Sequence, residues 1–278
     1  MIRLPVVKTL AISMVLAASP AWAQSNAVHP MLTDTWELQI GAFFPNEDVK
    51  IQAGLDESIP GDIVDFNNQL GVDESDTVFA AELRWRFGEK WSVMGQYWNS
   101  GVEGKRVLQE DVIWRDKTLK AGSSIEAGID TSIVRVFFGR TFWTGDNYEF
   151  GAGVGFHWLE LSAYIEGEFI GGGGTVAQSV DKVSAGAPLP NIGAWYIYAL
   201  DSRWAFQARM DWLSASFDEY SGGLFNVGLS ANYQFTDHWG AGLSYNYFNV
   251  DVDVDNKNWD GSAEMSMHGP FISANFSW

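Results

Sequence analysis

The last ten residues constrain the fold of this chain more than any other segment. From Gly269 to Trp278, apolar side chains occupy every second position, namely Ile272, Ala274, Phe276 and Trp278. Because successive side chains of a β-strand point to opposite faces, this spacing predicts a strand with one apolar face. An aromatic residue closing such a face is typical of a strand that stops at a membrane interface.

This last strand resembles the carboxy-terminal strand of bacterial outer-membrane β-barrels. The resemblance implies that Ile272, Ala274, Phe276 and Trp278 form an assembly signal. It also implies biogenesis partners, the barrel-assembly machinery and periplasmic chaperones, and a surrounding of outer-membrane lipid and lipopolysaccharide. The rest of the chain should then repeat the alternating pattern, and its amino terminus should direct export.

The amino terminus has the features of an export signal. Arg3 and Lys8 precede and flank an apolar run over 10–18, and Ala21-Trp22-Ala23 has the small-x-small arrangement that precedes cleavage. The apolar run is shorter than the roughly 20 residues that span a bilayer as a helix, although an internal anchor is the alternative. We therefore predict a cleaved signal peptide over 1–23, a short periplasmic segment over 24–33 and a barrel domain over 34–278.

Composition agrees with a barrel that has one lipid-facing side and one polar side. Aromatic residues make up 15% of the chain, yet the mean hydropathy is only −0.08. After removal of Arg3 and Lys8, 15 basic residues oppose 35 acidic ones, a net charge of −20 that disfavours nucleic-acid binding. The absence of cysteine excludes a lipoprotein anchor, disulfides and cysteine-based zinc sites.

The connections between apolar segments fall into two kinds, short and long, which predicts a barrel with short turns at one end and long loops at the other. Tight polar turns at 88–90, 144–147, 201–203 and 236–238 are flanked by aromatic residues, as in periplasmic turns. Long polar connections lie near 45–76, 102–125, 163–190, 214–223 and 250–264, and we assign them to the extracellular side. Segments between these connections predict an all-β, transmembrane, antiparallel up-and-down barrel of about ten strands. Eight or twelve strands remain open, since 49–55 could be a separate strand or an extension of the first.

Alternation along the predicted strands separates a lipid face from a lumen face. The lipid face is uncharged in most strands, as the cost of about 2–4 kcal/mol for a basic residue at the bilayer midplane requires. The alternate positions on the opposite face of the strands predict a polar lumen network, made of Glu37, Glu82, Arg84, Arg86, Arg135, His157, Arg209 and Asp211. These groups could pair in a filled core or line a narrow solute path, and we favour the filled core because ten strands enclose little free space.

No residue pattern points to catalysis, a cofactor or a firm metal site. Ten-stranded barrels include the omptin proteases, which use His-Asp and Asp pairs at the extracellular rim, but here His157 and Asp211 are the candidates and both are placed in the lumen. We therefore expect no enzyme and no catalytic residues. Asp251, Asp253 and Asp255 share one face of a strand and are a weak metal candidate, although a solvated acidic strand tip explains them better. The glycines at 171–174 indicate a flexible loop.

The first long connection resembles a family of uncharacterised Gram-negative outer-membrane barrels. The shared features are Val64-Asp65-Phe66, Leu70-Gly71-Val72-Asp73 and a strand ending Trp85-Arg86-Phe87, followed by an Ala-Pro-Leu-Pro stretch over 187–190 and Gly269-Pro270. This chain has Trp195 where the family has Arg. The resemblance implies the barrel fold and no specific reaction, so a structural barrel or narrow, porin-like solute channel is the leading function. An interaction or adhesion protein acting through acidic loops is the alternative, and a hydrolase is the third.

Overall fold

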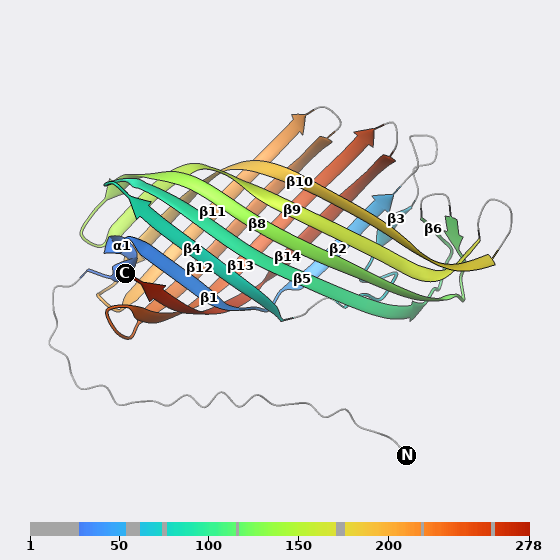
Figure 1. The fold of residues 1–278 in the computed structure, drawn as a ribbon, viewed down its shortest axis with the longest axis horizontal. Helices are drawn as coiled ribbons and strands as arrows, with labels where there is room; N and C mark the ends of the chain where they lie inside the picture. The colour runs from blue at the N-terminus through green and yellow to red at the C-terminus, as the bar shows by residue number, and fades with distance from the viewer. Residues whose placement is uncertain are drawn as a thin grey trace, which may run out of the picture.

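Ten strands form a closed ring in the computed structural model, which describes residues 28–53, 62–73, 77–114, 117–170, 176–217, 220–256 and 259–278. The ring consists of β1 (Trp36–Phe43), β4 (Val78–Phe87), β5 (Trp91–Val107), β8 (Ser124–Thr144), β9 (Tyr148–Ile170), β10 (Val176–Ala199), β11 (Trp204–Phe217), β12 (Tyr220–Gln234), β13 (Trp239–Asn256) and β14 (Trp259–Ser277). Each pairs antiparallel with the next in this order, and β1 pairs with β14, which closes the sheet (Figure 1). The predicted all-β barrel of about ten strands is confirmed.

Five short elements accompany the ring. The strand β2 (Asn46–Ala53) follows β1 and pairs with the upper part of β14, so the described part of 49–55 extends the wall beyond β1. The strand β3 (Ile63–Asp65) pairs with β2, and β6 (Val112–Trp114) forms a hairpin with β7 (Lys117–Leu119). The helix α1 (Pro30–Thr33) is one turn long. Within the described residues, no helix has the length and apolar character needed to cross a bilayer.

The short-turn end of the barrel, the periplasmic end in this fold class, matches the sequence prediction. Strands β4 and β5 are joined at 88–90, β8 and β9 at 145–147, β10 and β11 at 200–203, and β12 and β13 at 235–238. Gly88 has a φ of +60°, a conformation that favours glycine in so tight a turn. Both barrel closure and the carboxy terminus lie at this end, where Trp36 and Trp278 exchange backbone hydrogen bonds of 2.9 and 3.1 Å.

The opposite, extracellular end contains more strand than the sequence predicted. Most of 163–190, expected to be a polar connection, belongs to β9 and β10, which pair from Tyr148–Tyr198 up to Ile170–Val176. Likewise, β13 and β14 stay paired to Asn256–Trp259, within the expected connection 250–264. In Figure 1 the long strands β8, β9 and β10 sweep away from α1 and the carboxy terminus. The signal peptide and the glycines at 171–174 lie outside the described residues.

These strand extensions arise because the alternation continues while the polarity of the two faces reverses. In the lower part of β9, Phe156 and Trp158 point outward and are about two-fifths exposed, whereas His157 points inward and is buried. Beyond that point the inward positions are apolar, with Ile165 fully buried, and Glu160 is on the outer face. We call the level of outward aromatic side chains at Trp158 on β9 the outer girdle; Tyr97 on β5 and Tyr247 on β13 also belong to it. The strands therefore cross a lipid region below this girdle and a water-facing region above it.

An apolar core fills the barrel above the outer girdle. Its buried side chains come from β1, β2, β4, β5, β8, β9, β12, β13 and β14 and from the first two extracellular connections. The fully enclosed members are Val49, Val64, Phe66, Leu70, Trp114, Leu119, Ala127 and Ile165. The family-like segment 64–73 supplies three of these, and Phe66 packs edge-on against Trp114 at a ring distance of 5.7 Å. Above the membrane region the barrel is thus built like the interior of a soluble β-protein.

Candidate functional site

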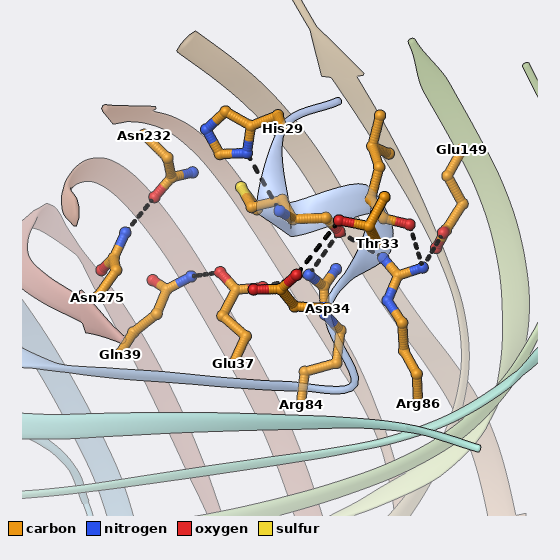
Figure 2. A network of polar contacts seen from close by, with 12 residues as sticks. His29, Thr33, Asp34, Glu37, Gln39, Arg84, Arg86, Glu149, Asn232 and Asn275 are labelled. Carbon is orange, nitrogen blue, oxygen red and sulfur yellow. Dashed lines mark hydrogen bonds and ion pairs between the residues drawn. The ribbon is translucent and has the colours of Figure 1, made fainter. Parts of the chain in front are cut away.

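The lower end of the lumen is capped by the amino-terminal segment. The helix α1 places buried Met31 inside the wall, next to Phe137 and Trp195. Arg84 donates to the backbone oxygen of Met31 at 2.8 Å, and Arg86 donates to the same oxygen at 2.5 Å (Figure 2). These two guanidinium groups satisfy carbonyls at the end of α1 that have no helical partner, so they fix the segment in the lumen mouth.

Each arginine of this pair also has a carboxylate. Arg84 forms a buried ion pair with Glu37, whose other oxygen accepts from Gln39 at 2.8 Å. Arg86 pairs with Glu149 at 2.5 Å. The two arginines lie close together, as Figure 2 shows, and two carboxylates offset their mutual repulsion.

Glu149 and Trp195 take part in this site although neither was expected to. Trp195 is buried at 2% exposure, and its indole Nε1 donates to Glu149 Oε1 at 2.7 Å. Glycine makes room for the ring, because a Cβ at Gly151 would come within 2.1 Å of it and one at Gly139 within 2.5 Å. The sequence alternation could have placed Glu149 on the lumen face, since it lies between the lipid-facing Tyr148 and Phe150. The contact with Trp195 joins residues 46 positions apart and carried no local signal.

The middle of the lumen contains a third ion pair. Arg209 Nη1 lies 3.3 Å from Glu82 Oε1 and 3.4 Å from Oε2, and the same carboxylate accepts from Gln96 Nε2 at 2.8 Å. Strands β4, β5 and β11 supply these three side chains from different parts of the wall. The pair therefore forms a bridge across the lumen.

A fourth buried pair lies higher and is the most enclosed. Arg135 donates to both oxygens of Asp211 in a bidentate arrangement, at 2.8 and 2.7 Å, and both side chains are almost fully buried. Asn226 adds a third donor to Asp211 at 3.0 Å. His157 Nε2 is 3.9 Å from Asp211 Oδ2, and its ring packs against Phe248 at 5.8 Å. The fork geometry of the guanidinium orients this carboxylate toward Arg135.

Taken together, the charges in the lower lumen are balanced. Four carboxylates, Glu37, Glu82, Glu149 and Asp211, face four guanidinium groups, Arg84, Arg86, Arg209 and Arg135, in four one-to-one pairs. A buried charge without a partner is costly, so this matching is what a closed, low-dielectric lumen requires. All eight network residues expected from the sequence lie inside the barrel, and seven of them form these pairs with Glu149.

Little free space remains among these side chains. One cavity lies beside Arg209 and Gln207 below the Glu82 bridge, and another lies above it between His157 and Trp98. Their volumes of about 30 and 20 Å³ hold only one or two water molecules each.

Aromatic side chains cover the polar lumen from above. Trp98 packs edge-on against Phe43 and against Phe248, with both ring distances 6.3 Å. Glu47 lies just above them, 1% exposed, and accepts hydrogen bonds from Ser100 at 3.1 Å and Thr131 at 3.2 Å. The outward positions at this level, including Asp48 and Ser266, are polar, which places Glu47 outside the membrane region. Burial raises the pKa of the Glu47 carboxyl, and the two hydroxyl donors oppose that rise only in part.

The remaining predicted residues lie away from the lumen. Asp251 and Asp253 are exposed on the outer face of β13 and alternate with inward Val250, while the side chain of Asp255 is outside the described part. No group of three or more His, Asp or Glu side chains in the described residues could hold a metal ion. Ile272 on β14 and Trp278 directly after it face outward at about one-half exposure, on the same side as Ala274 and Phe276.

Comparisons with known proteins agree with the geometry at the level of the fold. No protein-family model and no curated protein sequence matches the chain. The solved structure of the outer membrane protease OmpT from Escherichia coli is similar, with a TM-score of 0.57 and 10% identity over 87% of this chain and 96% of OmpT. The toluene transporter TodX of P. putida matches over 90% of this chain and 91% of its own at 8% identity and a TM-score of 0.40.

A third match is the transport unit of the autotransporter AIDA-I from Escherichia coli, at a TM-score of 0.40 and 10% identity, over 88% of this chain and 91% of that one. At such identities the likeness concerns the fold alone, and of these three structures OmpT has the TM-score that supports a comparison of folds. These three proteins differ in what their names say they do. The chain thus has the architecture of bacterial outer-membrane β-barrel proteins.

Proposed function

We propose that this protein resides in the outer membrane of a Gram-negative cell as a closed, non-conducting structural barrel. The outward apolar band below the outer girdle and the similarity in fold to OmpT support the location. In this proposal the segment 1–23 is removed after export, the barrel-assembly machinery recognises the last strand, and outer-membrane lipid and lipopolysaccharide surround the wall.

The observation that carries the proposal is how little free space the described side chains leave in the interior. An ion moving through the barrel would first meet four charge pairs and then the aromatic cover of Phe43, Trp98 and Phe248. Above that cover it would have to cross the apolar core of the extracellular part, where a charge is strongly disfavoured. A solute channel would need this core to open, so a structural role fits the interior better.

An interaction protein is the second candidate, because the extracellular strands form a packed structure with a polar outer face. Acidic side chains such as Glu160, Asp251 and Asp253 are exposed there. A hydrolase is less well supported. His157 and Asp211 are buried beneath Phe248 instead of being open to a substrate at the extracellular rim.

Conductance measurements test the closed-barrel proposal. The purified protein, refolded into planar bilayers, should give no stable single-channel currents. The double variant Trp98→Ala/Phe248→Ala removes the aromatic cover, whereas Trp158→Ala removes a lipid-facing ring of similar size and serves as the control. Because the apolar core lies above the cover, even the double variant should conduct only in brief, irregular events. Steady currents from the unmodified protein, with a selectivity that changes in Arg209→Gln, would refute the proposal.

A further inference from the structure

One basic side chain lies on the lipid-facing side of the barrel, near its periplasmic end. Arg140 of β8 is exposed and follows the outward Phe138 in the alternation of that strand. Among the described lipid-facing positions below the outer girdle, it is the only residue of the types Asp, Glu, Lys and Arg. A basic residue on this face is costly at the bilayer midplane and is tolerated near the interfaces, so the height of Arg140 decides what it contacts.

Arg140 lies at the height of the periplasmic headgroups. Its pairing partner on β5 is Trp91, the first residue after the short turn at 88–90. The Trp91 ring stacks against Phe138 at a ring distance of 5.0 Å, and both rings are about two-fifths exposed. Such outward rings next to the short turns mark the lower edge of the apolar band. The periplasmic leaflet of an outer membrane consists of phospholipid, whereas lipopolysaccharide occupies the extracellular leaflet.

Two aromatic rings hold the guanidinium group of Arg140. Its central carbon lies 5.4 Å from the centre of the Trp91 ring and 5.9 Å from that of Phe142, within the range of cation–π contacts. The pairing of β8 with β9 shifts between Thr141 and Trp143, which is a β-bulge at Phe142. Trp143 is exposed beside this bulge, and its ring lies 6.3 Å from that of Phe142. The guanidinium therefore lies in an aromatic setting formed by two strands.

The donors of this guanidinium have no acceptor in the described part of the chain. The four arginines of the lumen each have a carboxylate, whereas Arg140 forms no ion pair or hydrogen bond with the described residues. Its five N–H donors form a planar fork, and contact with ring faces leaves the edge of that fork free. Its neighbour on β9, Ala152, is too short to cover it. The fork is open to an anion at the membrane surface.

We propose that Arg140 binds the phosphodiester of an anionic phospholipid in the periplasmic leaflet, with Trp91 and Phe142 holding the guanidinium in place. Two phosphate oxygens fit the fork in a bidentate arrangement. The single negative charge of phosphatidylglycerol matches that of Arg140, whereas the extra ammonium of phosphatidylethanolamine or phosphatidylcholine is repelled. The adjacent turn adds no net charge, because Glu89 and Lys90 offset each other. This inference rests on the proposed location in the outer membrane.

Native mass spectrometry of the purified barrel in detergent tests the proposal with short-chain phosphatidylglycerol, phosphatidylethanolamine and phosphatidylcholine. We expect phosphatidylglycerol to bind about fivefold more tightly than the other two, the size expected for an exposed ion pair. Arg140→Gln removes the charge without touching the lumen pairs and should abolish this preference. The control Lys105→Gln removes the same charge from the exposed extracellular part of β5 and should keep it.

Two further variants separate the binding geometry from charge alone. Arg140→Lys keeps the charge but lacks the planar fork, and Trp91→Leu/Phe142→Leu keeps Arg140 but removes both rings. Each should reduce the preference to less than about twofold. Equal binding of the three lipids by the unmodified protein, or a fivefold preference that survives any of the three variants at these positions, would overturn the proposal. Because Arg140 lies outside the lumen, these results do not bear on conductance, and such a failure would leave the closed-barrel proposal standing.

Discussion

The membrane part and the extracellular part of this barrel use the same strands with opposite polarity. On β13, Leu243 and Tyr245 face lipid below the outer girdle while Ser244 and Asn246 face the lumen. Above the girdle, Asp251 takes an outward position, whereas Val250 is buried inward. The backbone alternation does not change. What changes is the solvent outside, from hydrocarbon to water, and the side chains on both faces change with it.

This comparison explains why the two interiors are built differently. Below the girdle the inside is closed by ion pairs such as Arg135–Asp211, which are orientation-dependent and must be matched one to one. Above it the inside is closed by apolar packing around residues such as Ile129 and Ile165, which tolerates substitution by similar volumes. The lower interior should therefore respond most strongly to the loss of a single partner.

The largest expected effect is at the Arg135–Asp211 pair. Replacing Arg135 by leucine leaves a buried carboxylate without its bidentate donor, which should lower the free energy of unfolding by about 3–5 kcal/mol. Denaturant unfolding of the protein in lipid vesicles measures this change.

The double variant Arg135→Leu/Asp211→Leu is the matched control for that prediction. It removes both charges and should recover most of the lost stability, because two apolar side chains can replace a buried pair. A loss below about 1 kcal/mol for Arg135→Leu alone would mean that water reaches this pair and that the lower lumen is open.

An intermediate effect on stability should distinguish the lipid-facing part of the outer face of β13 from the water-facing part. Leu243→Arg places a charge in the lipid and should cost about 2–4 kcal/mol. Asp253→Arg, on the same face of β13 above the girdle, should change stability by less than about 0.5 kcal/mol. Refolding titrations of the two variants in vesicles compare them directly. Equal costs would place the membrane boundary elsewhere on β13.

The sequence predicted the membrane part of the barrel well and the extracellular part poorly. Below the girdle, the uncharged alternate positions and the aromatic-flanked turns such as 88–90 are enough to predict the strands and their lipid-facing sides. The reason is that lipid requires apolar side chains on the outer face of every strand. Above it, the inward alternation that begins at Leu159 and Leu161 continues past Ile165, into the range 163–190 that the polar composition assigns to a connection. A shift of the apolar residues of β9 from even to odd positions was the available signal.

The long-range contacts within the lumen were beyond prediction from the sequence. The eight expected lumen residues follow from parity alone, but parity does not say that Arg86 pairs with Glu149 or that Trp195 shares that carboxylate. The helix α1 is not predictable from the sequence either, because it is only one turn long and is held in place by Arg84 and Arg86 of the barrel wall. Such contacts depend on the closure of the barrel, which brings distant strands together.

The smallest expected effect concerns Glu47, a carboxyl inside the apolar upper part. Its pKa is raised by burial, so its contribution to stability is fully present below the pKa of the unfolded chain and is lost as the pH rises through the folded value. Glu47→Gln keeps an acceptor for Ser100 and Thr131 but does not ionise. The variant should therefore be more stable than the unmodified protein above neutral pH, by about 1 kcal/mol, and the difference should shrink on acidification. Glu264→Gln, exposed on the outer face of β14, should leave the pH profile unchanged. Parallel profiles for the unmodified protein and Glu47→Gln would show that Glu47 keeps its charge in the folded state, and that the upper interior tolerates a charge as the lower one does.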